Sequence, residues 1–296
     1  MFKRWVLKGT QISELAECGR SGKNTDTIRR YIHQFLKSPP LPPVTPIVDN
    51  TISKEIYLKA DGKYFFGRHG CLLLYKKGTQ LIYWSFVKRE NYQNYVKDFI
   101  AIKQVGYVVL GITSDWPRSL VSATKSVFGN IPRQRCLVHT QRRCKGLLTK
   151  KPKTQAGVDL LRIVKELNHI KTKRDAKIWI KWLAKWGEEY QPLIEIRTYA
   201  KDSHGQNAGN MSGKAWWYTH KNLRATYRIL TSTRNNLFVY LDYPAVDKDT
   251  NGIESEFSHL KQKINMHRGL SGIRKISAIF WYVYLTNLKR KKRHKN

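Results

Sequence analysis

Two aspartates and a glutamate stand at positions where their carboxylates could work together. Asp61 and Asp115 each follow an apolar, β-prone run, and Glu254 lies near the start of a helical pattern. The chain contains few acids, since 21 Asp and Glu stand against 55 Lys and Arg. Carboxylates at the ends of core strands are costly to bury without a cationic partner, and divalent metals prefer such hard oxygen ligands. The three acids therefore predict a divalent metal site.

The chemistry that such a site suggests is phosphoryl transfer on nucleic acid. That reaction commonly uses two Mg²⁺ or Mn²⁺ ions about 3.5–4 Å apart, and Asp and Glu are suitable ligands for both. Taken singly, each aspartate has an ordinary structural explanation, because Asp61-Gly62 can be a turn and Asp115 a helix cap. Their order, their strand-end positions and the basicity of the chain favour the shared site.

The composition indicates a polyanionic partner. The net charge is +34 and the pI is about 10.1, which makes nucleic acid the first expectation and an anionic membrane surface the competing one. No apolar run reaches the roughly 18 residues of a membrane span. The four cysteines form no C-x-x-C pair, so neither a disulfide framework nor a complete zinc site is indicated. We expect the protein in a reducing environment, either the cytoplasm or the nucleoid.

Residues 1–38 are expected to form a small helix-turn-helix module. Two short amphipathic helices flank a glycine-containing break, and Arg29, Arg30 and His33 lie off the apolar stripe of the second, where they could contact DNA. An ordinary helical hairpin fits the same pattern. The proline-rich segment 39–52 is predicted to be a stiff linker that holds this module at a distance from the rest.

The next part, residues 53–148, has the pattern of a mixed α/β sheet. A three-stranded meander precedes alternating helix and strand, which is typical of this fold class. The expected strands cover residues 55–60, 70–75, 80–87, 107–113 and 135–138. Asp61 would then end the first strand and Asp115 would follow the fourth, at the same edge of the sheet if these two strands are adjacent and parallel.

The remaining sequence is mainly helical. Residues 149–235 are predicted to form an α-helical insertion, residues 236–288 to complete the sheet domain with two helices, and residues 289–296 to be a mobile basic tail. Within the insertion, Trp179, Trp182 and Trp186 could stack on a base. Their spacing of three and four residues favours a place in the helix core.

Four short motifs carry a resemblance to a known family. They are Asp61-Gly62-Lys63-Tyr64, Ser114-Asp115, Cys136-Leu137-Val138-His139 and Thr250-Asn251-Gly252-Ile253-Glu254. The chain resembles DDE transposases of the Mutator-like group and related bacterial insertion-sequence transposases over about residues 55–270. The Cys-x-x-His is the most specific of these marks. Lys63 departs from the family, where a small residue often stands.

The resemblance implies a ribonuclease-H-like fold interrupted by a helical insertion. It also implies cleavage at transposon ends, attack of the 3′-hydroxyl on target DNA, and a homo-oligomer on double-stranded DNA. Asp61, Asp115 and Glu254 would be the catalytic ligands of two metal ions. Helical geometry alone leaves Glu256 as a rival for the third place, and the resemblance favours Glu254 because it follows Asn251 by three residues.

Further residues are expected to support the motif or to contact DNA. Cys136 and His139 could support the site, although a half-buried thiol and a hydrogen-bonded histidine would explain them equally well. The residues expected to contact DNA here are Arg133, Arg135, Arg142, Arg143, Lys145, His267 and Arg268. Two alternatives stay open: a non-catalytic helix-turn-helix DNA-binding protein, and a ribonuclease-H-like nuclease or resolvase without strand transfer.

Overall fold

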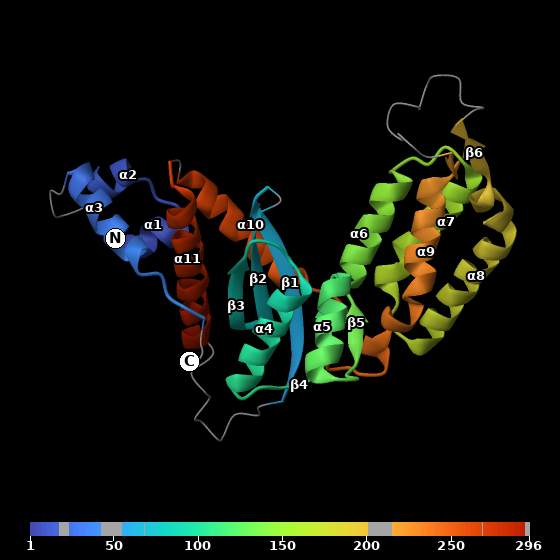
Figure 1. Cartoon of the computed structure of the whole chain (residues 1–296), viewed down its shortest axis with the longest axis horizontal. Coiled ribbons are helices and arrows are strands. Elements are labelled where there is room, and N and C mark those ends of the chain that lie inside the picture. The colour runs from blue at the N-terminus through green and yellow to red at the C-terminus, as the bar shows by residue number, and fades with distance from the viewer. Residues whose placement is uncertain (18–23, 43–54, 68, 201–214, 268, 294–296) are drawn as a thin grey trace. The chain divides into compact units, whose positions relative to one another are not determined.

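The computed structural model describes residues 1–17, 24–42, 55–67, 69–200, 215–267 and 269–293. The chain divides into two compact units (Figure 1). Unit 1 combines Met1–Ile131 with Thr250–Asn296, and unit 2 is Pro132–Asp249. Among the described residues, no helix combines the length and apolar character needed to cross a membrane.

Unit 1 is built on strands of a mixed sheet, which confirms the predicted α/β class. Within this unit the strand order is β3-β2-β1-β4. The pairs β1–β2 and β2–β3 are antiparallel, whereas β1 and β4 are parallel. β2 is apolar and buried almost throughout, as expected of a strand covered on both faces. The bounds are β1 Glu55–Phe66, β2 His69–Lys77, β3 Gln80–Val87 and β4 Val108–Ser114.

Strand β1 is longer than the sequence pattern predicts. It does not end at Asp61 but continues to Phe66, so the interpretation of Asp61-Gly62 as a turn is wrong. The parallel pairing with β4 does stop at Ala60, opposite Ser114. Beyond that point β1 stays paired with β2, as far as Phe66 opposite His69. Asp61 is therefore the first residue of β1 after its parallel partner has ended.

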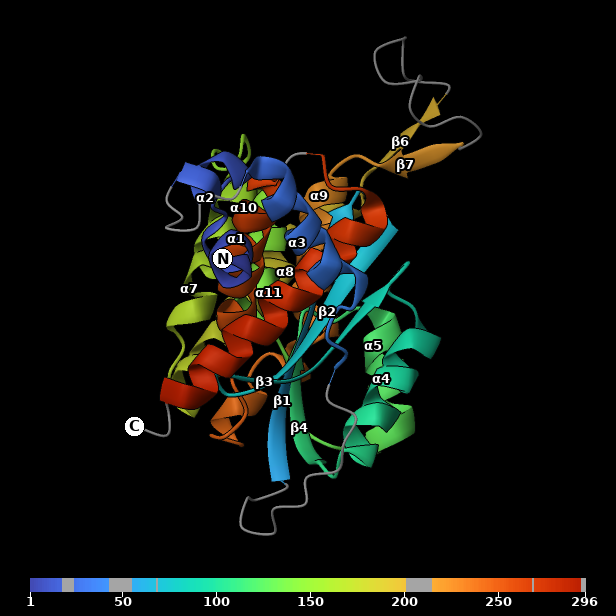
Figure 2. The same ribbon diagram turned by 90° about the vertical axis from the view of Figure 1, so that its left-hand side faces the viewer.

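Helices cover both faces of these strands (Figure 2). On one face α4 (Tyr92–Gln104) and α5 (Arg118–Phe128) enclose a core with Leu58 and Leu73. On the other, α10 (Asn251–Met266) and α11 (Gly272–Arg293) pack on Leu72 and Leu74. The basic segment that was expected to be a tail instead continues α11 as far as Arg293, which is consistent with the good helix propensity of Lys and Arg.

The N-terminal helices belong to the same core. They are α1 (Phe2–Lys8), which was not predicted, α2 (Ile12–Glu17) and α3 (Thr25–Lys37). The ring of Phe2 stacks on Phe35 at 4.4 Å between centroids, and Trp281 of α11 donates to the Phe35 carbonyl at 2.9 Å. The expectation that a linker holds these helices at a distance is wrong. Residues 43–54 of that linker, and 18–23 between α2 and α3, lie outside the described residues.

Unit 2 is mainly helical, and its first strand is shorter than predicted. β5 ends at Arg135, and the apolar pair Leu137-Val138, which was expected to continue the strand, begins helix α6. A small hairpin, β6–β7, was not predicted, and the polar segment 201–214 lies outside the described residues. The elements are β5 Arg133–Arg135, α6 Leu137–Leu148, α7 Gln155–Glu166, η1 Leu167–His169, α8 Lys173–Glu195, β6 Arg197–Tyr199, β7 Trp216–Tyr218, α9 Lys221–Ser232, η4 Arg234–Asn236 and η5 Val239–Leu241.

The tryptophans of α8 divide between core and surface. Trp179 and Trp186 are buried, and their indole N–H groups donate to backbone carbonyls of α7 at 2.8 and 2.9 Å. The prediction of a core position is confirmed for these two. It is wrong for Trp182, which is 49% exposed.

Candidate functional site

The acids predicted from the sequence meet at one edge of the unit 1 sheet. Asp61 lies in β1 just past the end of its parallel pairing, and Asp115 directly follows the last residue of β4. Glu254 lies in the first turn of α10, a helix that packs on β1. A carboxylate oxygen of Asp61 and one of Glu254 lie within 4.8 Å of each other. The predicted convergence of Asp61 and Glu254 is thus present in the structure.

Electrostatics connect Asp115 to the same cluster. The pKa of Asp61 is raised well above its usual range, first by burial and next by the negative charge of Asp115, with Glu254 and Glu90 adding to the effect. A hydrogen bond from the Gly62 N–H to Oδ1 at 2.9 Å acts in the opposite direction. Since Asp61 is only 6% exposed, water relieves little of this repulsion. A proton or a cation must do so.

These residues fit a divalent cation. Carboxylate oxygens are the ligands that Mg²⁺ and Mn²⁺ prefer, and a buried carboxylate beside like charges gains most from a nearby positive ion. Asp61, Asp115 and Glu254 would hold the metal. The Thr250 hydroxyl, 3.4 Å from Asp61 Oδ2, would hold the Asp61 carboxylate in place.

The backbone after Asp115 supports the assignment of a special role to this corner. Trp116 has a φ of 75°, in the left-handed region that residues other than glycine rarely adopt. Its N–H points back to the Ser114 hydroxyl at 3.3 Å. Strained backbone of this kind is concentrated at functional sites. The sharp turn ends β4 abruptly and leaves Asp115 at its tip.

The structure separates Glu254 from its rival Glu256. Glu256 is buried and accepts hydrogen bonds from Lys76 Nζ at 2.7 Å and from Arg290 at 2.8 Å. Lys76 Nζ also lies 3.5 Å from the Gly252 carbonyl in the first turn of α10. Glu256 is therefore the centre of a buried ion network that connects α10 with β2 and α11. Glu254 is the acid that lies beside Asp61.

A fourth acid, Glu90, was missed by the sequence analysis. Its carboxylate lies against Gly62, where a Cβ would come within 1.9 Å of Oε1, and the Cys71 thiol donates to the same oxygen at 3.4 Å. Burial raises the pKa of Glu90. Glu90 stands in the loop between β3 and α4, and no local pattern marks it. Gly62, where the Glu90 carboxylate occupies the space of a side chain, would have been the nearest available signal.

The residues predicted to contact DNA have different environments. Arg29 and Arg30 are exposed on α3, as are Arg142, Arg143 and Lys145 on α6. Arg133 is half-buried in β5. Arg135 is buried and donates to Thr233 and to the Ile229 carbonyl, so a role in the fold accounts for it. Arg268 lies outside the described residues.

The remaining motif residues belong to helix starts and ends. Cys136 is buried at the N-cap of α6, His139 is half-buried in its first turn, and Asn251 is the exposed first residue of α10. His267, at the end of α10, stacks on Trp5 with ring centroids 4.0 Å apart. Its Nε2 lies 3.0 Å from the Trp5 carbonyl. His267 therefore connects the end of α10 to α1 within unit 1.

No protein-family model matches this chain, and no curated protein sequence matches it either.

Proposed function

We propose that the protein is a DNA transposase, which cleaves transposon ends and joins the freed 3′-hydroxyl to target DNA by two-metal phosphoryl transfer. The observation that carries the proposal is the gathering of Asp61, Asp115 and Glu254 at one edge of the sheet, with Asp61 buried. The net charge of +34 supports a polyanionic substrate. The four motifs that resemble the DDE transposases supply the reaction type.

The fold is compatible with this proposal. The parallel pair β1–β4, with an antiparallel meander on one side of it, suits a ribonuclease-H-like sheet. In that interpretation unit 2 is the helical insertion that precedes the helix with the third acid, and α2 and α3 form the helix-turn-helix. The resemblance further suggests a homo-oligomer assembled on double-stranded DNA near the bacterial nucleoid.

The side chains of the site have distinct tasks in this mechanism. Asp61, fixed by the Gly62 N–H and the Thr250 hydroxyl, would hold a metal ion between the strand ends and α10. Asp115 and Glu254 would complete the ligand set from two other elements. When bound, a pair of divalent ions activates the attacking oxygen and stabilises the leaving one. The buried position of Asp61 keeps its charge strong toward a cation, because little solvent screens it.

A strand-joining assay tests the proposal directly. A labelled duplex with a free 3′-hydroxyl at the candidate transposon end is incubated with a plasmid in Mg²⁺ or Mn²⁺, and joined products are counted. We expect joining by the native chain and its loss in Asp61→Asn, Asp115→Asn and Glu254→Gln. Glu188→Gln, which changes an exposed acid of α8, is the matched control and should join normally.

Two outcomes of the same assay would replace the proposal. Metal-dependent cutting without any joining would indicate a nuclease or resolvase of the same fold. DNA binding that needs no metal and survives Asp115→Asn, with neither cutting nor joining, would indicate a non-catalytic DNA-binding protein.

A further inference from the structure

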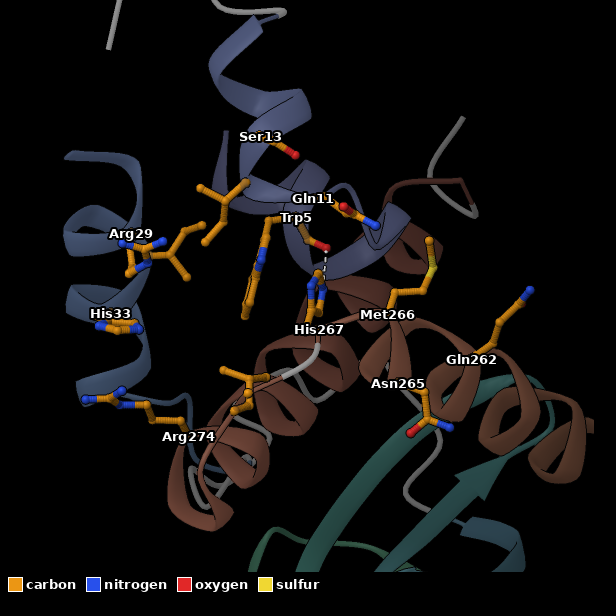
Figure 3. A pocket seen from close by; sticks show the side chains of 14 residues that line it. Trp5, Gln11, Ser13, Arg29, His33, Gln262, Asn265, Met266, His267 and Arg274 are labelled. Atoms are coloured by element: carbon orange, nitrogen blue, oxygen red, sulfur yellow. Dashed lines mark hydrogen bonds between the residues drawn. The ribbon is translucent and has the colours of Figure 1, made fainter. Parts of the chain in front are cut away.

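A groove of about 1110 Å³ crosses unit 1 where the N-terminal helices meet the α10–α11 connection (Figure 3). One wall is α3, the other is the end of α10 with the turn between α1 and α2, and the start of α11 closes it below. We call it the α3–α10 groove. The carboxylates of the candidate metal site do not line it.

One wall of the α3–α10 groove is positively charged. Arg29 and His33 project from α3, and Arg274 of α11 lies beside His33 (Figure 3). The pKa of His33 is lowered, first by burial and then by the positive charges of Arg274, Arg29 and Lys37. Asp26 balances part of the Arg29 charge through an ion pair on the exposed side of α3. Among the described residues that line the groove, no Asp or Glu offsets Arg274.

The opposite wall presents uncharged hydrogen-bonding groups. Gln262 and Asn265 project from α10 one helical turn apart, and Gln11 and Ser13 lie near the start of α2 (Figure 3). Gln262 and Asn265 are both exposed. Side-chain amides can donate and accept at the same time, so this wall suits a ligand with both kinds of polar group.

The floor of the groove is preformed. Trp5 is buried against the ring of His267, and the His267 Nε2 contacts the Trp5 carbonyl at 3.0 Å. This stack fixes the distance between α1 and the end of α10, which means that binding would require little rearrangement here. The ring of His267 therefore helps to shape the groove.

We propose that the α3–α10 groove binds the phosphate backbone of duplex DNA, with Arg274 and Arg29 on phosphates and Gln262 and Asn265 on sugar or base-edge groups. A guanidinium can hold a phosphate through two parallel hydrogen bonds, and amides commonly contact both backbone and bases. The net charge of +34 favours a long polyanion over a short acidic peptide. The choice of DNA as the partner rests on the proposed function, whereas the groove itself does not depend on catalysis.

The test measures DNA binding without catalysis. The full chain is titrated onto a fluorescently labelled duplex in EDTA at several salt concentrations, and the anisotropy gives affinity and salt dependence. Arg274→Ala should weaken binding several-fold and reduce the slope of log K against log salt by about one, as expected for a lost phosphate contact. Asn265→Ala should weaken binding with the slope unchanged, because it removes no charge. Lys261→Ala, an exposed neighbour on α10 outside the groove, removes the same charge as Arg274→Ala and is the control.

The outcomes separate this inference from the proposed function. If Arg274→Ala and Lys261→Ala behave alike, the groove does not hold DNA and the inference fails, even if the native chain joins strands. If binding depends on Arg274 in a protein that never joins strands, the groove stands and the transposase proposal fails. Polyglutamate that binds in an Arg274-dependent way, while the duplex does not, would identify an acidic peptide as the occupant and overturn the inference. Circular dichroism of each variant confirms that it is folded.

Discussion

The buried pair Lys76–Glu256 gives the sharpest test of how α10 is held. The two side chains are 3% and 2% exposed and their charged atoms lie 2.7 Å apart. Replacing Glu256 by Gln leaves the Lys76 ammonium buried without the carboxylate. Breaking a buried pair in this way typically destabilises a protein by about 3–5 kcal/mol. We expect Glu256→Gln to lower the free energy of unfolding by an amount in this range.

The chemistry of lysine sets an upper bound on that loss. A lysine that cannot stay charged can release its proton, which at pH 7 costs no more than about 4–5 kcal/mol for an ordinary pKa near 10.4. The reverse change, Lys76→Met, should cost less, because Arg290 still pairs with Glu256 at 2.8 Å. Because this charge-assisted hydrogen bond remains, we expect Lys76→Met to lower the free energy of unfolding by about 1–3 kcal/mol. The geometry therefore predicts that Glu256→Gln lowers the free energy of unfolding more than Lys76→Met does.

The loss in Glu256→Gln should also depend on pH with a definite sign. Burial already lowers the pKa of Lys76, and the charge of Glu256 acts against this effect. Without that charge, the folded state binds the lysine proton more weakly than the unfolded chain does. The stability difference from the native chain should therefore shrink as pH rises from 7 toward 10.

Urea unfolding of the native chain, the two single variants and the double variant Lys76→Met/Glu256→Leu provides the measurement. The double variant should be more stable than Glu256→Gln, since no buried charge is left without a partner, and Arg290 is partly exposed to water. A cost for Glu256→Gln that is below that of Lys76→Met, or that does not change with pH, would refute the reasoning.

Three further predictions concern other parts of the fold. Burial raises the pKa of Asp98 to about 6, although the hydroxyls of Tyr75 and Ser85 donate to its carboxylate and act in the opposite direction. Asp98→Asn removes this titration, so its free energy of unfolding should rise by up to about 3 kcal/mol relative to the native chain as pH rises from 4 to 7, measured by paired urea titrations. Gly62→Ala should lower the free energy of unfolding by about 1–3 kcal/mol because its Cβ meets the half-buried Glu90 carboxylate, whereas Gly146→Ala, in open space on α6, should raise it by about 0.5–1 kcal/mol. Trp179→Phe should lower the melting temperature through its lost hydrogen bond and packing, while Trp182→Gln should leave the free energy of unfolding within about 0.5 kcal/mol of the native value.

Local patterns predicted the parts of the site that local forces determine. The apolar run before Asp115 forms strand β4, which ends at Ser114, one residue beyond the predicted end, so the strand tip was predictable. β1 was not, because its continuation past Asp61 depends on antiparallel pairing with β2, a partner that periodicity alone does not specify. Leu137-Val138 suits a strand or a helix equally well, and tertiary structure decides: the Leu137 N–H donates to the Lys248 carbonyl, and the helix begins there.

The choice between the two acids of α10 shows the same limit. Both flank the apolar stripe, which does form as predicted and buries Ile253 and Phe257. What separates Glu254 from Glu256 is Lys76, which lies 180 residues earlier in the chain. No window of local sequence contains both partners. The family resemblance favoured Glu254 from a spacing, and the structure supplies a physical reason for the division.

The different roles of Glu254 and Glu256 connect the stability of the fold to the candidate chemistry. Successive residues of an α-helix are 100° apart, so a rotation of α10 by one residue would carry Glu254 away from Asp61 and Glu256 away from Lys76 together. The second rearrangement would break the buried ion pair and the contact between Lys76 and the Gly252 carbonyl. Its cost of several kcal/mol holds the helix in the one orientation that places Glu254 beside Asp61. We therefore expect folded Glu256→Gln protein to join strands more slowly than the native chain at saturating metal and DNA. The Lys76→Met/Glu256→Leu variant should regain stability without regaining the full rate of joining.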